Sequence, residues 1–274
     1  MVHACSLFEK ETTLTGSFEN RVVAITGASR GIGLATARHF AELGAHVVLI
    51  ARSKETVHEE AAKLSARGQK ALGLDCDVSK FRSVASTIDT VMSEFGRLDI
   101  LVNNAGTIDP IARMDVADPE AWSLAIDTNV KGVFYFMRAA LPVMREAKSG
   151  VIVNMSSGAA NSALEGWSHY CSSKSAVKKL TECGHKEFGE HGIRVVGLSP
   201  GTVATDMMAT IKTSEVNPVS QLDWSTHIPP EWAAKAVAYL CGDRGECHAG
   251  TDFSIKTPEG RAMVGLPADG APDG

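Results

Sequence analysis

The chain has 274 residues, of which 44 % are hydrophobic and 22 % charged, proportions typical of a globular enzyme with a sizeable core. Its net charge of −5 argues against nucleic acid or an anionic membrane surface as the main partner. No run approaches the roughly 20 consecutive apolar residues of a membrane span. The composition therefore favours neither a nucleic-acid-binding protein nor a membrane protein.

The N-terminal residues and the cysteines indicate the compartment. Residues 1–18 are polar and lack the basic-then-apolar layout of a signal peptide, so we expect a polar arm ahead of the fold. The six cysteines show no C-x-x-C spacing, which favours reduced thiols and a cytoplasmic location. The only close group, Cys241, Cys247 and His248, lacks paired zinc-ligand spacing, so we expect no metal site.

Short, continuously apolar runs alternate along the chain with longer stretches of helical periodicity. The runs that predict strands are 21–26, 46–51, 70–75, 98–103, 150–156 and 193–199. The stretches that predict helices are 32–43, 54–67, 80–95, 119–147 and 170–190. This alternation predicts an α/β fold, a single doubly wound Rossmann-type parallel sheet with helices on both faces. We expect this domain to span 19–258, with a mobile substrate lid at about 206–228 and a C-terminal tail at 259–274.

Three glycines, Gly27, Gly31 and Gly33, lie between the first predicted strand and the first predicted helix. Glycine permits positive φ there and lets a phosphate approach the backbone. The following helix directs its free N–H groups and its positive dipole end at the same point. Glycines also serve plain tight turns, but the carboxyl end of the first strand is where such sheets bind ligands. The position therefore favours a phosphate site.

Three motifs together resemble the short-chain dehydrogenase/reductase family: TGxxxGxG at 26–33, NNAG at 103–106 and the YCSSK stretch at 170–174. The resemblance covers about residues 21–205, with the motifs in the family's order and separation. It implies an NAD(P)-dependent oxidoreductase that acts on alcohol and carbonyl groups. It also implies cofactor contacts at Gly27, Ser29, Arg30, Gly31, Ile32, Gly33, Arg52, Asp77, Val78, Asn104, Ala105, Gly106, Tyr170, Lys174, Pro200, Gly201, Val203 and Thr205.

The charges near the expected ribose site favour NADP(H) over NAD(H). NAD-binding members of the family carry an acidic residue at the end of the second strand, where this chain has Ala51 followed by Arg52. Arg30 stands in the glycine turn, and two guanidinium groups at one ribose repel unless an anion such as a 2′-phosphate lies between them. The alternative is that both arginines are plain surface charges. Asp77 is assigned to the adenine edge, with a helix N-cap as its alternative, although Ser79 suits that cap better.

Tyr170, Lys174, Ser157 and Asn129 are the candidate catalytic residues. A tyrosine pKa of about 10 is too high for a ready base, but a lysine four residues later lies one helical turn away and favours the phenolate. Ser157 has the family's spacing for the serine that hydrogen-bonds the substrate oxygen, and Ser156 should face the other way. Asn129 resembles the asparagine that bends its helix and holds a water near the lysine; the alternative is a helix-interrupting residue without catalytic duty.

These residues predict reduction of a small ketone or aldehyde to an alcohol with NADP(H). The alternatives are a 3-oxoacyl-acyl-carrier-protein reductase and a non-catalytic NADP(H)-binding regulatory protein. A sugar epimerase of the extended family would need a larger C-terminal domain than the roughly seventy residues after Gly201. The expected pocket lining, 107–114 and 158–169, shows no Lys/Arg cluster that could grip a carrier protein. Within it, Trp167 either stacks on a ring substrate or simply packs.

The C-terminal region bears on assembly. The stretch AGTDFSIKTPEGRAMVG at 249–265 replaces the glycine-rich last strand of many family members, a region that builds one of the family's two usual subunit contacts. We therefore expect a homodimer through the helices around 119–147 and 170–190, with a homotetramer as the alternative.

Overall fold

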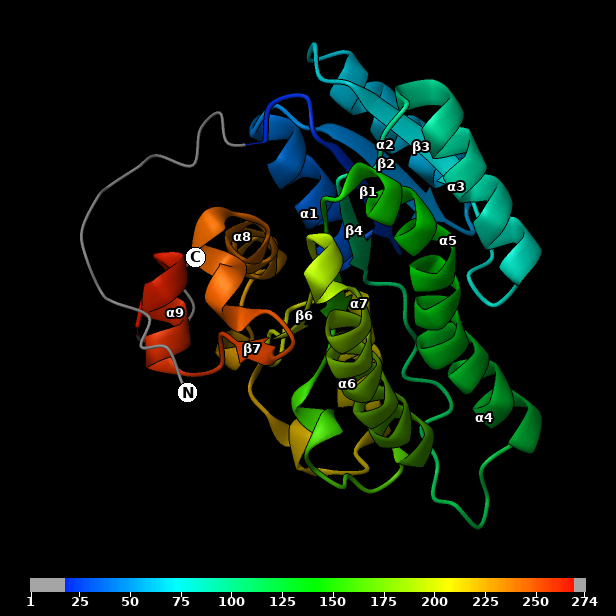
Figure 1. Cartoon of the computed structure of the whole chain (residues 1–274). Coiled ribbons are helices and arrows are strands. Elements are labelled where there is room, and N and C mark those ends of the chain that lie inside the picture. Colours follow the sequence, from blue (N-terminus) through cyan, green and yellow to red (C-terminus); the bar gives the residue numbers. More distant parts are fainter. Residues whose placement is uncertain (1–17, 269–274) are drawn as a thin grey trace.

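A seven-stranded, fully parallel sheet forms the centre of the computed structural model, which describes residues 18–268 (Figure 1). Most of the expected N-terminal arm and residues 269–274 lie outside the described residues. The strand order is β3-β2-β1-β4-β5-β6-β7. The strands are β1 (Val22–Thr26), β2 (His46–Ala51), β3 (Ala71–Asp75), β4 (Ile100–Asn103), β5 (Gly150–Met155), β6 (Ile193–Ser199) and β7 (Asp252–Ser254). The predicted fold class is confirmed, and the sheet has one strand more than the six predicted.

Helices occupy each of the predicted helical stretches. They are α1 (Gly31–Glu42), α2 (Lys54–Ser65), α3 (Phe81–Phe95), α4 (Pro119–Ile126), α5 (Gly132–Ala147), α6 (Ser168–Phe188), α7 (Asp206–Ser214), α8 (Pro230–Cys241) and α9 (Pro258–Val264). The stretch 119–147 is interrupted, because a π-helical turn, η1 (Asp127–Lys131), separates α4 from α5. α4 begins at Pro119, the first residue of the predicted stretch. The Asp118 side chain caps it by accepting a hydrogen bond from Glu120 N, and Pro119 takes the first helical position.

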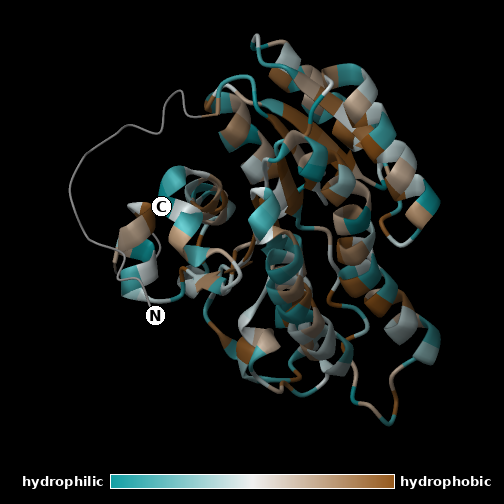
Figure 2. Cartoon of the chain, in the orientation of Figure 1, coloured by the Kyte–Doolittle hydropathy of each residue, from teal (hydrophilic) through white to brown (hydrophobic). Residues whose placement is uncertain are grey.

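Successive strand residues supply two cores, one on each face of the sheet. Val23 and Ile25 pack with α1, α2 and α8, whereas Val22 and Ala24 pack with α3, α5 and α6. This alternation follows from the period of two in an extended strand, and it explains why β1 is buried at every position. Figure 2 shows the same layering, with the hydrophobic strands enclosed between helices whose outer faces are hydrophilic.

Both ends of the described chain pack against the domain. Phe18, which we counted with the arm, is fully buried and meets Phe40 edge-on at 5.0 Å between ring centroids. At the other end α9 lies against α8, with the Arg261 guanidinium 5.5 Å from the Trp232 ring centroid and Leu266 in the core. The described part of the expected tail is thus a packed helix (Figure 1).

The expected lid region contains ordered elements. It consists of α7, two short 3-10 turns at Pro218–Gln221 and Trp224–Thr226, and a bridge between Val203 and Ile228. Its mobility stays a prediction.

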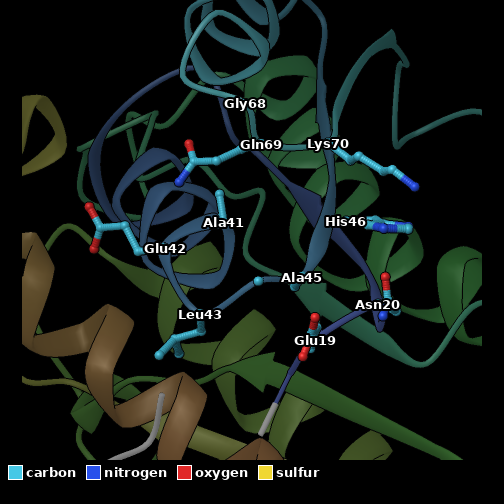
Figure 3. Close-up of a pocket in the computed structure, with 11 residues that line it drawn as sticks. Glu19, Asn20, Ala41, Glu42, Leu43, Ala45, His46, Gly68, Gln69 and Lys70 are labelled. Atoms are coloured by element: carbon cyan, nitrogen blue, oxygen red, sulfur yellow. The ribbon is translucent and has the colours of Figure 1, made fainter. Parts of the chain in front are cut away.

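A surface cavity of about 370 Å³ lies at the amino ends of β1, β2 and β3 (Figure 3). Glu42, His46, Gln69 and Lys70 are among its lining residues. In a parallel sheet this edge is opposite the carboxyl ends where ligands bind, so the cavity is separate from the expected site.

The described residues hold no group of three or more His, Cys, Asp or Glu side chains that could bind a metal ion. No helix within residues 18–268 has the length and apolar character that crossing a membrane requires.

Candidate active site

The predicted site residues come together at the carboxyl edge of the sheet. They follow β1, β2, β3, β4, β5 and β6, each just after its last strand residue or on the next helix. β1 and β4 are neighbours at the centre of the sheet. From β1 the chain continues outward to β2 and β3, and from β4 it continues outward in the opposite direction to β5, β6 and β7. Such a switch point leaves a crevice between diverging loops, which is where these folds hold their ligands.

The turn after β1 admits only glycine at its key positions. Gly27 and Gly31 have φ of +65° and +55°, which side chains rarely adopt. A Cβ on Gly33 would lie 2.3 Å from the Gly27 carbonyl oxygen. Asn104 fixes the turn from the neighbouring strand, since its Nδ2 donates to the carbonyl oxygens of Thr26 at 2.9 Å and Gly27 at 3.2 Å. The turn is therefore bare and rigid.

The start of α1 fits a phosphate group. No side chain caps this helix, and its first turn contains no acidic residue. The N-cap residue Arg30 is extended, so the first N–H groups of α1 have no intrahelical partner and face the glycine turn. A bare turn and a free, uncapped helix N-terminus together form an anion cradle of the kind that a dinucleotide pyrophosphate requires.

The two arginines assigned to the 2′-phosphate differ in their contacts. Arg52 is exposed directly after Ala51, the last residue of β2, and no carboxylate follows that strand end. Arg30 instead pairs with Asp206 at the start of α7, with Nη1 3.0 Å from Oδ2 and both side chains more than 70 % exposed. The sequence pattern gave no sign of this ion pair, which joins the glycine turn to the first residue of the lid.

Asp77 and Val78, assigned to the adenine edge, follow β3. Asp77 Oδ1 accepts hydrogen bonds from the backbone N and the hydroxyl of Ser79, and its carboxylate pairs with Lys80 at 3.2 Å. The pKa of Asp77 is lowered, because these hydrogen bonds outweigh the cost of its burial. The N-cap of α3 is Lys80, so the cap that we preferred at Ser79 was wrong. Val78 is buried, and its side chain packs against Gly132.

Tyr170, Lys174 and Ser157 lie together at the end of β5 and on α6. The Lys174 ammonium is 5.5 Å from the centroid of the Tyr170 ring, and its Nζ donates to the Met155 carbonyl at 2.6 Å. Burial raises the pKa of Tyr170 to about 12, and a hydrogen bond with Ser157 acts in the opposite direction. Burial also lowers the pKa of Lys174 to about 8. At neutral pH this group therefore carries a protonated phenol beside a mostly charged lysine.

Asn129 lies in η1 and holds the loop after β4. Its Oδ1 accepts from Thr107 N and its Nδ2 donates to Thr107 O, both at 2.8 Å. The same Nδ2 lies 3.3 Å from the hydroxyl of Ser173, which in turn donates to the Tyr170 carbonyl at 2.8 Å. Ser173 and the hydroxyl of Thr26, which accepts from Asn104 N at 2.9 Å, are site residues that the sequence analysis missed. Only their places in the YCSSK and TG motifs could have drawn attention to them.

The stretch after β6 passes close to the glycine turn. Gly201 has φ of +86°, Val203 is buried, and Thr205 Cγ2 would lie 3.2 Å from a Cβ placed on Gly31. Pro200 precedes this turn directly after the strand. These residues therefore border the same crevice as the start of α1.

An apolar cluster surrounds one side of Tyr170. Ile108, Trp167, Met208 and Ile211 form its buried centre. The partly buried residues packed on this centre are Ile111, Leu164, Tyr170, Cys171, Met207 and Val219. They come from the loop after β4, the loop after β5, α6 and the lid. The Trp167 ring meets the Tyr170 ring edge-on at 5.6 Å, so the indole packs beside the phenol as part of this wall.

Comparison with known proteins identifies the family. The model of the short chain dehydrogenase family matches residues 21–216. The chain belongs to the short-chain dehydrogenase family. It is accordingly an NAD(P)-dependent oxidoreductase that acts on alcohol and carbonyl groups.

The relatives of this short-chain dehydrogenase differ in substrate and cofactor. It is 36 % identical to cis-4-hydroxycyclohexanecarboxylate dehydrogenase of Sinomonas cyclohexanicum over 87 % of this chain and 96 % of that protein. It is 35 % identical to an NADPH-dependent pterin aldehyde reductase of Arabidopsis thaliana over 82 % and 91 % of the two chains. The solved structure of an NAD+-bound xylitol dehydrogenase superposes with a TM-score of 0.81 at 27 % identity, covering 87 % and 98 %. The family therefore leaves the cofactor and substrate to be argued from this chain's own residues.

Proposed function

We propose that this short-chain dehydrogenase reduces small, uncharged ketones or aldehydes to alcohols with NADP(H). The observation that carries the proposal is the grouping of Ser157, Tyr170 and Lys174 between an anion cradle and an apolar cluster. A cofactor phosphate on one side and an apolar carbonyl compound on the other would meet at the Tyr170 hydroxyl.

The side chains would divide the work of reduction as follows. NADPH, when bound, supplies the hydride. Tyr170 donates its proton to the substrate oxygen, and Ser157 hydrogen-bonds the same oxygen and stabilises its developing charge. Lys174 stays charged beside the phenol, which makes the proton easier to lose, and also contacts the nicotinamide ribose. Asn129 keeps the loop after β4 in place and serves the path that returns a proton to Tyr170.

The protonation states favour the reductive direction. The raised pKa of Tyr170 keeps the phenol protonated across the physiological range, which suits a proton donor. Alcohol oxidation needs the phenolate, which depends on the positive charges of Lys174 and of the oxidised nicotinamide. Without bound cofactor, Tyr170 therefore carries the proton that carbonyl reduction requires.

The NADP(H) preference rests on Arg30 and Arg52. Both follow strands that are neighbours in the sheet, and Ala28 N bonds the Ile50 carbonyl at 3.1 Å, which keeps the two turns side by side. Ala51 presents no carboxylate that would repel a phosphate. The remaining contacts to the cofactor would be made by the residues assigned above from Gly27 to Thr205.

Replacing Asp206 by asparagine should tighten NADPH binding. Arg30 must exchange Asp206 for the 2′-phosphate, and an exposed ion pair is worth little, so we expect a gain of up to about fivefold in affinity. NADH carries no such phosphate, and its affinity should stay the same. Fluorescence titration of both cofactors measures the change.

Asp223→Asn is the control for this prediction, because Asp223 is another exposed lid carboxylate. Among the described residues its side chain accepts hydrogen bonds only from Ser225 of its own turn. If the affinities for NADPH and NADH change equally, or if the control changes them in the same way, the assignment of Arg30 to the phosphate site is wrong.

The apolar cluster supports a small, uncharged substrate. Apart from Tyr170 and Cys171, none of its side chains can ionise. Arg113 and Glu165, on the loops that carry Ile111 and Leu164, form an ion pair at 2.8 Å, so their charges offset each other. The relatives named for cis-4-hydroxycyclohexanecarboxylate and for a pterin aldehyde both support a ring-sized substrate, although the first of these compounds carries a carboxylate.

A panel of carbonyl compounds tests the proposal directly. Loss of NADPH absorbance would be followed with cyclic ketones, diketones, aldehydes and an acetoacetyl thioester. Turnover of cyclic ketones or aldehydes supports the proposed function, whereas preference for the thioester would indicate the acyl-carrier-protein reductase. Cofactor binding with no turnover of any member would indicate the regulatory protein.

We also propose a cytoplasmic homodimer. The five cysteines among residues 18–268 are free thiols, as a reducing compartment would allow. Phe134 on α5 and Leu124 on α4 are 48 % and 53 % exposed, large for apolar side chains on the helices we expect at the interface. α9 covers α8 within the chain, in the C-terminal region where the family's second contact forms.

Phe134→Glu should convert the dimer into a monomer, because a buried carboxylate at the interface would lose its hydration. Sedimentation velocity of the unmodified protein should give twice the chain mass of 29.0 kDa, and that of the variant the chain mass alone. Met114→Glu, at an 82 % exposed apolar residue outside the helices, should remain a dimer. A tetramer would show that the C-terminal region still builds a second contact.

A further inference from the structure

Asp252 on β7 reaches the end of β5 from two strands away in the sheet. The Ser156 hydroxyl donates to Asp252 Oδ2 at 2.9 Å, and Ser156 N donates to the Leu198 carbonyl at 2.8 Å. Ser156 is 4 % exposed and directly precedes Ser157 in the chain. These two hydrogen bonds hold the residue before the candidate catalytic serine by its backbone N–H and by its hydroxyl.

The other carboxylate oxygen of Asp252 is buried and accepts no hydrogen bond from the described residues. β6 makes room for it, because a Cβ on Gly197 would lie 2.6 Å from Asp252 Oδ1. A buried carboxylate oxygen without a partner is costly, so a fold keeps one where its charge serves other groups.

The charges that act on Asp252 all come from α6. They are Lys174, Lys178 and Glu182, of which Lys178 also donates to Asn161 Oδ1 at 2.7 Å. Burial raises the pKa of Asp252, while the Ser156 hydrogen bond and the two lysines lower it. The Lys174 ammonium donates to the Met155 carbonyl at 2.6 Å, and Asp252 accepts from the next residue, Ser156, so both charges are held at the same strand end. In return the carboxylate raises the pKa of Lys174 against the effect of burial.

We propose that Asp252 is a positioning residue of this active site, which holds Ser157 in place through Ser156 and sets a negative charge at the strand end that Lys174 binds. The first role depends on the hydrogen bond and the second on the negative charge. The inference rests on the proposed function for the duties of Ser157 and Lys174. The proposal gives a role to a residue of the C-terminal stretch 249–265, which departs from the family pattern.

Two variants separate the two roles. Asp252→Asn keeps the shape and a hydrogen-bond acceptor for Ser156 but removes the charge. Lys174 should then lose its proton at lower pH, so the alkaline limb of the pH profile of carbonyl reduction moves down by about one unit, equal to about a tenfold lower rate above the limb. Ser156→Ala keeps the charge and frees Ser157, so the rate should fall severalfold at every pH without a shift of the limb.

Ser254→Ala is the matched control on the same strand, since within residues 18–268 the Ser254 hydroxyl accepts a hydrogen bond only from Lys256 N. Its rate and pH profile should equal those of the unmodified protein. If Asp252→Asn does not fold, Asp252→Thr replaces it, which removes the charge with a residue favoured in strands.

A measurement without substrate keeps the inference apart from the proposed function. The side-chain amines of the unliganded protein, labelled with 13C-lysine, are titrated by NMR, with Lys174→Arg to assign the signal. Lys174 should titrate at lower pH in Asp252→Asn than in the unmodified protein, whether or not any carbonyl is reduced. An unchanged titration, or a pH limb that Ser156→Ala moves as far as Asp252→Asn, would overturn the proposal.

Discussion

Tyr170→Phe should lower the rate of carbonyl reduction by about 10²–10⁴-fold while NADPH still binds. The substitution removes one oxygen and leaves the ring, so the edge-on contact with Trp167 and the fold should survive. What disappears is the group placed to give a proton to the substrate oxygen. NADPH consumption with the best carbonyl of the panel measures the rate, and fluorescence titration measures binding.

Tyr135→Phe provides the control, because Tyr135 lies on α5 among Phe81 and Phe134 and away from the site. Ser157→Ala should cause a loss between mild and severe, since Tyr170 remains to bind the oxygen. Lys174→Ala should lower the rate and also weaken NADPH. If Tyr170→Phe reduces carbonyls as fast as the unmodified protein, the proposed mechanism is wrong.

Replacing Arg30 and Arg52 together by alanine should weaken NADPH binding by about a hundredfold and leave NADH nearly unchanged. A hydrogen bond to a charged group is worth about 1.5–3 kcal/mol, and solvent around these exposed side chains keeps the sum near the low end. Titration of both cofactors gives the ratio of affinities.

Arg67→Ala removes an exposed arginine at the opposite edge of the sheet and should change neither affinity. A double variant that keeps the NADPH to NADH ratio, or an unmodified protein that prefers NADH, would contradict the NADP(H) assignment.

The elements that sequence patterns predicted are those with strong local signals. Six strands are continuously apolar because both faces of the sheet are covered, and α1 begins after an unmistakable glycine turn. β7 was not predicted because it has only three residues and because its first residue, Asp252, is polar. η1 was not predicted because the helical periodicity of the sequence continues through it. The contact of Asn129 with Thr107 joins two separate segments, and a local pattern does not report such a contact.

The missed features of the site are contacts between distant parts of the sequence. Arg30 and Asp206 are 176 residues apart, and Ser156 and Asp252 are 96 apart. A motif reports which residue types recur at a short spacing, but it carries no information on which side chains from other loops meet them. The assigned roles at Ser157, Tyr170 and Lys174, and the pairing of Tyr170 with Lys174, were available from short motifs, whereas Asp252 and its contact with Ser156 were not.

The division between the two edges of the sheet indicates how this protein could be attached to a support. The residues assigned to catalysis and cofactor binding lie at or near the carboxyl edge, while the cavity of Figure 3 and the loop 66–70 lie at the amino edge. An affinity peptide inserted after Arg67 would anchor the enzyme by this inert side. The cofactor crevice would then face the bulk solution, open to exchange of spent cofactor for fresh cofactor.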